Sequence, residues 1–201
     1  YEFLGFSQPM SAYYENLKQQ GFRILSLAYS KDQITTPANM ELLGHVVLSD
    51  DIKDNTKETF DYFESQGVEV KIISGDNHVA VYGVARKAGF KETARAIDMT
   101  KVGDEEFDRV VLEHDIFGRV TPEQKQKMVT VLQEVGKTVA MSGDGVNDVL
   151  ALKKADISFA MNGATGAAKS VSNIVFLTDD FAVFYDILME GRRVINNIQK
   201  V

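Results

Sequence analysis

The feature of this sequence that most limits its fold is a repeated alternation of short apolar segments with amphipathic segments. The apolar segments have the length of strands, and each is followed by a segment with helical periodicity. The expected strands are 42–48, 68–73, 118–120, 137–141, 156–160 and 173–176, and the expected helices are 55–66, 77–87, 122–134, 146–154 and 181–199. Buried strands joined through helices form a parallel sheet, so the pattern predicts an α/β fold: a doubly wound parallel sheet with helices on both faces.

The beginning of the chain differs from this pattern. A predicted helix and a predicted strand, 22–29, are followed by a polar segment that contains a proline. We therefore expect residues 1–40 to be a linker and the C-terminal remnant of an upstream domain, and residues 41–201 to form the main domain. Because the sequence starts at Tyr1 rather than at a methionine and stops within a polar helical pattern, we expect it to be a fragment.

The composition excludes several classes of protein. Acidic residues number 29 and basic residues 22, a net charge of −7, which argues against nucleic-acid binding. The chain contains no cysteine, so disulfides, thiolate metal sites and thiol catalysis are excluded. No segment has the ~18 consecutive apolar residues that a membrane-spanning helix needs.

Two predicted strands end in the same kind of loop. Ser-Gly-Asp occurs at 74–76 and again at 142–144, each time after an apolar strand and before a helix. In parallel α/β folds, ligands bind at the carboxyl ends of the strands. These two loops are therefore where we expect the functional site.

The second loop continues with polar residues as far as Asp148. Two glycines allow a sharp turn, and Asp144, Asn147 and Asp148 follow within a few positions. Hard oxygen ligands of this kind suit Mg²⁺, which takes one or two carboxylates and leaves other positions to water and phosphate. A solvated turn rich in Asp, Asn and Gly is the alternative interpretation.

The first loop and one lysine are candidate phosphate contacts. Ser74 offers a hydroxyl and Gly75 a backbone N–H to a phosphate oxygen. Lys125, on the helix that Thr121 is expected to cap, would neutralise charge on a transferring phosphoryl group. Taken singly, the loop also fits an ordinary turn with Asn77 as N-cap, and Lys125 also fits a solvated lysine.

The sequence has a hydroxyl loop, then a lysine, then an acidic loop, in this order on successive strand ends. This arrangement resembles that of the haloacid dehalogenase superfamily. Residues 142–161 closely resemble the signature of the P-type cation-transporting ATPases, and 119–125 is similar to the segment with their phosphate-contacting lysine. Residues 50–53 resemble the hinge between the nucleotide-binding and phosphorylation domains. Residues 191–197 resemble the stalk helix, and 21–29 resembles the end of the nucleotide-binding domain.

This resemblance implies a role for individual residues. Lys125 and Asp148 would be catalytic, and Asp144 and Asp148 would hold Mg²⁺. The residues implied in phosphate or nucleotide binding are Ser74, Gly75, Asp76, Lys125, Asn147, Asp50 and Lys53. Mg²⁺ and ATP would be the cofactors. The partners would be the nucleotide-binding, actuator and transmembrane domains of a pump, which would place this part at the cytoplasmic side of the cell membrane.

The sequence departs from the family in a few places. Ser74 and Ser142 stand where threonine is usual, which keeps the hydroxyl, and Lys53 replaces an arginine of the hinge, which removes bidentate pairing. The histidines lack the spacing of a metal site, and we expect them to be surface or packing residues: His45, His78 and His114.

The nucleophile of this family, the aspartate of a D-K-T-G-T motif, has no counterpart here. Asp32 and Thr35 have a D-x-x-T spacing, but they lie in a polar segment rather than at the end of a strand. We therefore expect the nucleophile to lie upstream of Tyr1 and this piece alone to be inactive. Two alternatives remain open: a soluble phosphatase of the same superfamily with an upstream D-x-D, and a non-enzymatic regulatory module that binds Mg²⁺ or nucleotide.

Overall fold

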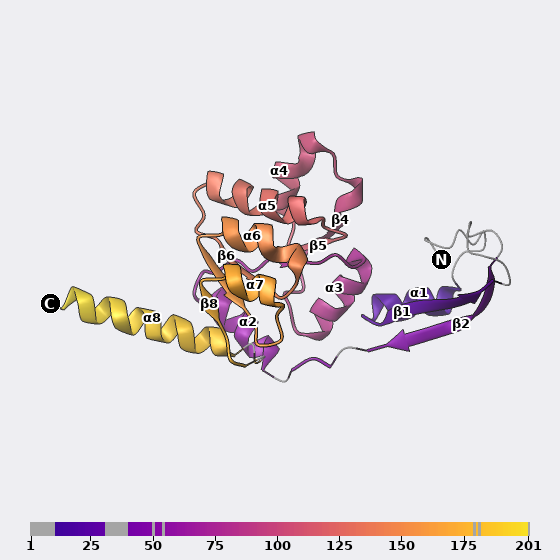
Figure 1. Ribbon diagram of the computed structural model, residues 1–201, viewed down its shortest axis with the longest axis horizontal. Helices are drawn as coiled ribbons and strands as arrows, with labels where there is room; N and C mark the ends of the chain where they lie inside the picture. The colour runs from indigo at the N-terminus through magenta and orange to yellow at the C-terminus, as the bar shows by residue number, and fades with distance from the viewer. Residues whose placement is uncertain are drawn as a thin grey trace.

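The structure is a computed structural model, and it describes residues 11–30, 40–49, 51–53, 55–178, 180 and 182–200. Its elements form an arm near the N-terminus, a body of parallel strands and helices, and a long C-terminal helix (Figure 1). The helix extends from the body on the side opposite the arm.

The arm consists of helix α1 (Ala12–Gln19) and strands β1 (Arg23–Tyr29) and β2 (Glu41–Leu48). The two strands pair antiparallel. The strand expected at 42–48 therefore exists, but it does not join the parallel strands as the alternation suggested. Its partner β1 alternates between exposed and half-buried side chains, which is the pattern of a ribbon with one open face rather than of a strand buried on both faces.

Six strands of the body form two parallel sheets within the described residues. The first sheet has the order β3-β5-β4 and contains β3 (Ile72–Ile73), β4 (Ala96–Asp98) and β5 (Ile116–Gly118). The second has the order β6-β7-β8 and contains β6 (Ala140–Gly143), β7 (Ile157–Ala160) and β8 (Ile174–Val175). The predicted α/β class with parallel strands is thus confirmed.

Helices connect these strands. They are α2 (Thr56–Ser65), α3 (His78–Lys87), α4 (Asp104–Glu113), α5 (Pro122–Glu134), α6 (Val149–Lys154), α7 (Gly166–Val171) and α8 (Val183–Gln199), with 3-10 turns η2 (Met99–Lys101) and η3 (Val146–Asp148). Two helix starts follow directly from sequence. Thr121 and Gln124 form a reciprocal capping box at α5, and the Asn77 side chain accepts a hydrogen bond from the Val79 N–H at α3.

Two parts of the body differ from expectation. No strand or helix is predicted between residues 87 and 118, where the structure contains β4, η2 and α4. The strand expected at 118–120 is β5, which ends at Gly118 because Arg119 has a φ of +55°, outside the extended region. The chain therefore turns immediately after β5.

Four apolar clusters hold the body together. Two of them pack against the first sheet: one includes Phe107, Phe117 and Met128, and the other includes Phe90 and Ile116. Another lies between the second sheet and α6, where Leu152 and Ala160 are buried. The last is aromatic: the Phe184 ring contacts those of Phe63, Phe159 and Phe176, and the Phe159 ring stacks on that of Phe176. Helix α8 is attached to the body through this aromatic cluster.

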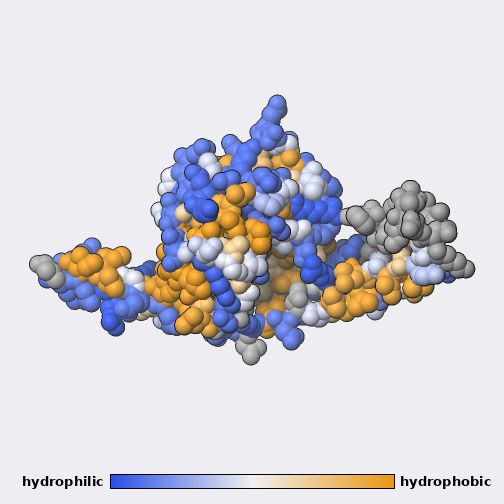
Figure 2. Space-filling model, in the orientation of Figure 1, coloured by the Kyte–Doolittle hydropathy of each residue, from blue (hydrophilic) through white to orange (hydrophobic). Residues whose placement is uncertain are grey.

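Apolar side chains are also exposed outside the body. Along the arm, Leu25, Leu27 and Leu43 are each at least half exposed, and Figure 2 shows the apolar surface that they contribute to. Helix α8 exposes Ile195 and Ile198. Within the part of the chain that the structure describes, no helix has both the length and the apolar character needed to cross a membrane.

Candidate functional site

The acidic loop begins at the carboxyl end of β6 and turns directly into η3. Gly143 is required at this turn, because a Cβ atom at this position would lie 2.6 Å from the Cβ of Asp148. The missing side chain lets Asp148 fold back against the end of the strand. As a result the Asp148 side chain is buried, although the preceding residues Val146 and Asn147 are exposed.

A buried ion pair joins this loop to helix α5. Lys125 Nζ lies 2.6 Å from Asp148 Oδ1, and both side chains are about nine-tenths buried. The other oxygen of Asp148, Oδ2, accepts hydrogen bonds from the backbone N–H groups of Asp144 at 3.2 Å and Gly145 at 3.1 Å. One carboxylate therefore fixes the lysine and the loop at the same time.

Asp144 and Asn147 are placed differently from Asp148, because both are exposed. The Asp144 carbonyl accepts a hydrogen bond of 2.8 Å from the Thr165 N–H, which fixes the backbone beneath the side chain. Among the described residues, no group of three or more acidic or histidine side chains could hold a metal ion. An exposed carboxylate on a rigid turn suits Mg²⁺, which often uses one or two protein carboxylates and fills its other positions with water and phosphate.

The Ser-Gly-Asp loop after β3 is held by the end of the neighbouring strand β5. The Val120 N–H donates to the Ser74 carbonyl at 3.0 Å, and the Arg119 N–H donates to the Asp76 carbonyl at 2.8 Å. The Ser74 hydroxyl accepts from the Asp76 N–H at 3.1 Å. Gly75 is exposed, and a Cβ atom there would meet no atom within 4 Å. The backbone of the loop is fixed while the space beside Gly75 stays open.

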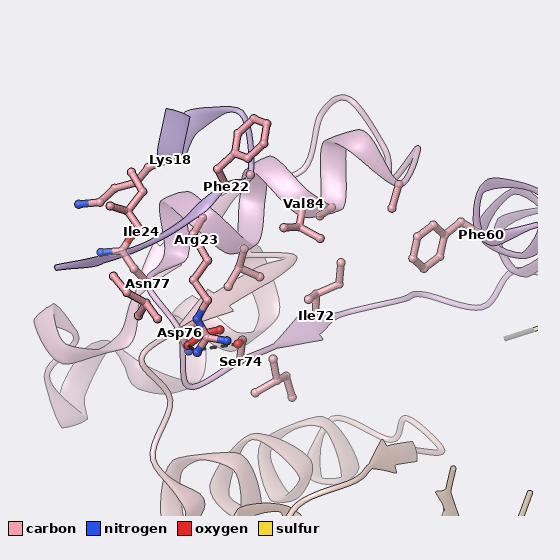
Figure 3. Close-up of a pocket in the computed structure, with 17 residues that line it drawn as sticks. Lys18, Phe22, Arg23, Ile24, Phe60, Ile72, Ser74, Asp76, Asn77 and Val84 are labelled. Atoms are coloured by element: carbon pink, nitrogen blue, oxygen red, sulfur yellow. Dashed lines mark hydrogen bonds and ion pairs between the residues drawn. The ribbon is translucent and has the colours of Figure 1, made fainter. Parts of the chain in front are cut away.

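Asp76 also contacts the arm. Its Oδ1 lies 2.9 Å from an Arg23 guanidinium nitrogen, and both side chains are about half exposed (Figure 3). The contact borders a cavity of about 570 Å³ between β1 and α3, lined largely by apolar side chains. An exposed pair of this kind contributes about 0–1 kcal/mol, so it tethers the arm only weakly.

Of the two residues implied in the hinge, only Lys53 belongs to the described part of the chain. Asp50 lies outside the described residues, as do Asp32 and Thr35. Lys53 is near Asp180, just before α8. The pKa of Asp180 is lowered by a hydrogen bond from the Ala182 N–H, then by one from Asn55, with a smaller contribution from the charge of Lys53.

Sequence reasoning missed a cluster of polar residues behind the Ser-Gly-Asp loop. His78, Asp98 and Arg119 come together there, at the start of α3 and the ends of β4 and β5. His78 had been expected to be a surface or packing residue. The cluster was missed because β4 has no clear apolar pattern, and without β4 nothing brings Asp98 to this edge.

Comparisons with known proteins agree with this geometry. A family model described as haloacid dehalogenase-like hydrolase matches residues 8–156. The probable cation-transporting ATPase exp7 of Streptococcus pneumoniae is 42% identical over 188 residues, which cover 91% of this chain and 24% of that protein. The calcium-transporting ATPase CtpE of Mycobacterium tuberculosis is 43% identical over 190 residues, which cover 93% of this chain and 24% of that protein. The chain thus spans about a quarter of the length of these relatives.

A solved structure shows the same fold. The catalytic domain of the CPx-ATPase CopB-B, studied for its conformational changes upon nucleotide binding, superposes with a TM-score of 0.56 at 20% sequence identity. The match covers 80% of this chain and 56% of that one. It supports the α/β arrangement of parallel strands and helices described above.

Proposed function

Since this chain belongs to the haloacid dehalogenase-like hydrolases, as the hydrolase domain of a P-type cation-transporting ATPase, we propose that it supplies the phosphate- and Mg²⁺-binding loops with which an intact pump forms and hydrolyses an aspartyl-phosphate. The observation that carries this proposal is the buried pair of Lys125 and Asp148, 2.6 Å apart at the carboxyl end of β6. A lysine held in one orientation by a buried carboxylate suits the stabilisation of a transferring phosphoryl group.

Each residue of the site has a distinct role in this proposal. The Lys125 ammonium group binds a phosphoryl oxygen, and Asp148 fixes its direction. The Ser74 hydroxyl and the Gly75 N–H bind other oxygens of the same group. Asp144 carries the carboxylate that holds Mg²⁺, with Asn147 beside it, while both Asp148 oxygens already accept from protein donors. Mg²⁺, when bound, supplies charge neutralisation at the phosphoryl oxygens.

The reaction requires an aspartate that this chain does not supply. A carboxylate oxygen of that aspartate attacks the γ-phosphorus of ATP, the bond to the bridging oxygen breaks, and ADP leaves. Water then attacks the phosphorus of the acyl phosphate and releases inorganic phosphate and the free carboxylate. Lys125 stabilises the charge on the phosphoryl oxygens in both steps.

The two parallel sheets of the described residues suggest where the strand that carries the nucleophilic aspartate would lie. β3 and β6 are edge strands of the two parallel sheets, and the Ser-Gly-Asp loop follows one while the acidic loop follows the other. The segments that lead into these two strands lie close together: Lys137 Nζ, before β6, is 3.9 Å from Glu69 Oε2, before β3. A strand inserted between β3 and β6 would join them into one doubly wound sheet. Its carboxyl end, with the aspartate, would then lie between the two loops.

The arm and the C-terminal helix fit the remaining parts of a pump. We assign α1, β1 and β2 to the end of a nucleotide-binding domain, whose other strands would cover the exposed apolar face of the ribbon. Helix α8 would continue toward a transmembrane domain, which places this domain at the cytoplasmic side of the membrane. Because relatives at 43% identity are named calcium-transporting, Ca²⁺ is the first ion to assay.

The test is phosphoenzyme formation from radiolabelled ATP in the full-length protein that contains this chain. Lys125→Ala and Asp144→Asn should each lower Mg²⁺-dependent labelling by about 100-fold or more. Lys127→Ala is the matched control, since Lys127 lies on the same helix and its ammonium group faces Asp104 and the Phe107 ring instead of Asp148. If Asp144→Asn were labelled as strongly as the wild type, the proposed metal role of Asp144 would be refuted. If Lys125→Ala were labelled as strongly as the wild type, the proposed site would be refuted.

A further inference from the structure

Behind the Ser-Gly-Asp loop lies a polar cluster centred on the carboxylate of Asp98. Asp98 is the last residue of β4 and is about 5% exposed. Its Oδ1 accepts hydrogen bonds from the Thr100 N–H at 3.1 Å and from the Thr100 hydroxyl at 2.7 Å. Its Oδ2 lies 3.6 Å from an Arg119 guanidinium nitrogen and 3.7 Å from His78 Nδ1.

The electrostatics show that Asp98 stays ionised in this buried position. Burial alone would raise its pKa, but the hydrogen bonds from Thr100 and the charge of Arg119, with a smaller contribution from His78, outweigh burial and lower the pKa. His78 Nδ1 is shielded from solvent and has no hydrogen-bond partner in the described part of the chain. Asp98 Oδ2 thus faces a nitrogen atom of each of these two side chains.

The two partners of Asp98 connect directly to the Ser-Gly-Asp loop. Arg119 donates its backbone N–H to the Asp76 carbonyl, and it does so from a left-handed conformation with a φ of +55°. A non-glycine residue in this conformation stays there only if its surroundings hold it. The ion pair with Asp98 is one such constraint, because it anchors the Arg119 side chain.

His78 connects to the loop through the start of α3. It is the first residue of this helix, two residues after Asp76. The helix start packs against the end of β5 so closely that a Cβ atom at Gly118 would lie 2.3 Å from the His78 backbone nitrogen. The contact with Asp98 holds His78 on the other side. The loop is thus fixed at its end by two residues that share one buried carboxylate.

We propose that Asp98 is a positioning residue for the phosphate loop 74–76. It contacts neither phosphate nor metal. Its carboxylate packs against Arg119, with which it forms an ion pair, and against His78, and these residues hold the loop in the arrangement that presents the Gly75 N–H. The inference rests on the proposed function of the loop as a phosphate-binding element.

The variant Asp98→Asn isolates the charge, because asparagine keeps the shape and can still accept both hydrogen bonds from Thr100. The matched control is Asp115→Asn, at the opposite end of β5. Asp115 is buried to a similar extent as Asp98. Its Oδ1 lies 2.5 Å from Lys91 Nζ, and its Oδ2 accepts a hydrogen bond from the Arg95 N–H. Both variants remove one buried, paired charge from the same sheet, but only Asp98 is connected to the loop.

The first measurement is amide hydrogen exchange in this chain, which needs no catalysis. In Asp98→Asn, the amides of Arg119 and Val120 should exchange about 10-fold faster relative to those in the middle of α5. In Asp115→Asn, the Arg95 amide should exchange faster instead. Equal exchange of Arg119 and Val120 in the two variants would overturn the proposal.

The second measurement is the KM for ATP in phosphoenzyme formation by the full-length protein. Asp98→Asn should raise the KM by about 10- to 100-fold, the scale expected from a small misplacement of a binding group, while Asp115→Asn stays within about threefold of wild type. An equal KM in the two variants would show that Asp98 has only a structural role. If Asp98→Asn does not fold, Arg119→Gln, which removes the other charge of the Asp98–Arg119 ion pair, serves in both measurements. Wild-type phosphoenzyme labelling in Lys125→Ala would refute the proposed function alone, since the exchange experiment stands independently.

Discussion

Removing the charge of Lys125 should destabilise the domain by several kcal/mol. In Lys125→Met, Asp148 keeps its two backbone hydrogen bonds but loses the ammonium group 2.6 Å away, in a position that is about nine-tenths buried. Removing one partner of a buried ion pair costs about 3–5 kcal/mol, because the other charge is left without compensation. The two remaining N–H donors moderate this cost, so we expect a loss near the lower limit, about 3 kcal/mol.

The assay is urea denaturation of this chain at pH 7, followed by circular dichroism. Asp148→Asn and the double variant complete a thermodynamic cycle. The double variant should be more stable than the sum of the single losses predicts, by at least about 1 kcal/mol, because neither charge is then buried alone. Lys127→Met should cost at most about 2 kcal/mol, since its ion pair with Asp104 is exposed and its cation–π contact with Phe107 contributes about 0.5–1 kcal/mol. If the loss of unfolding free energy in the double variant equalled the sum of the two single losses within about 0.5 kcal/mol, Lys125 and Asp148 would not interact as a buried ion pair.

Four further variants test other parts of the account by denaturation of the same chain. Gly143→Ala should cost about 1–3 kcal/mol because its Cβ atom would collide with Asp148, whereas Gly75→Ala should be nearly neutral; equal losses would contradict the loop geometry. Thr121→Ala should cost about 1 kcal/mol through loss of the capping box, and an unchanged midpoint would contradict that cap. The pKa of Asp115 is lowered, because hydrogen bonds from Lys91 and from the Arg95 N–H, together with the lysine charges, outweigh the opposing effect of burial. Its contribution to stability is therefore full above the unfolded pKa of about 3.9 and is lost as the pH falls through the lower folded value. In Asp115→Asn, the free energy of unfolding should therefore fall less steeply with decreasing pH below about pH 4. The same pH dependence as in the wild type would contradict this assignment.

Much of the fold could be predicted because local signals and tertiary packing agree. The start of α5 is an example: Thr121, Pro122 and Gln124 specify the cap, and the structure contains it. The carboxyl end of β6 is another, since an apolar strand followed by Ser142 and two glycines requires a turn at this point. In both places the sequence determines the local geometry with little help from distant residues.

The parts that could not be predicted depend on long-range contacts. Strand β4 has only three residues and takes its place from pairing with β5, which its own sequence does not reveal. The apolar sequence of β2 predicts a strand of the parallel sheet, and only its antiparallel pairing with β1 shows that it belongs to the arm.

The same limit applies to the candidate site. The resemblance implied a metal role for Asp148, and the structure adds a contact that the sequence does not reveal: the oxygens of Asp148 face Lys125 and the backbone of the loop. Arg119 and Asp98 are separated by 21 positions and meet only because β4 and β5 are neighbours.

The most direct test of the central claim is to locate the phosphorylated residue in the full-length protein. The protein is labelled with radioactive ATP and Mg²⁺, quenched in acid and cleaved, and the labelled peptide is identified by mass spectrometry. We predict a hydroxylamine-sensitive acyl phosphate on an aspartate upstream of this chain, and no such label when Lys125 is replaced by alanine. An acyl phosphate on a residue within these 201 positions, or none at all in the wild-type protein, would contradict the account.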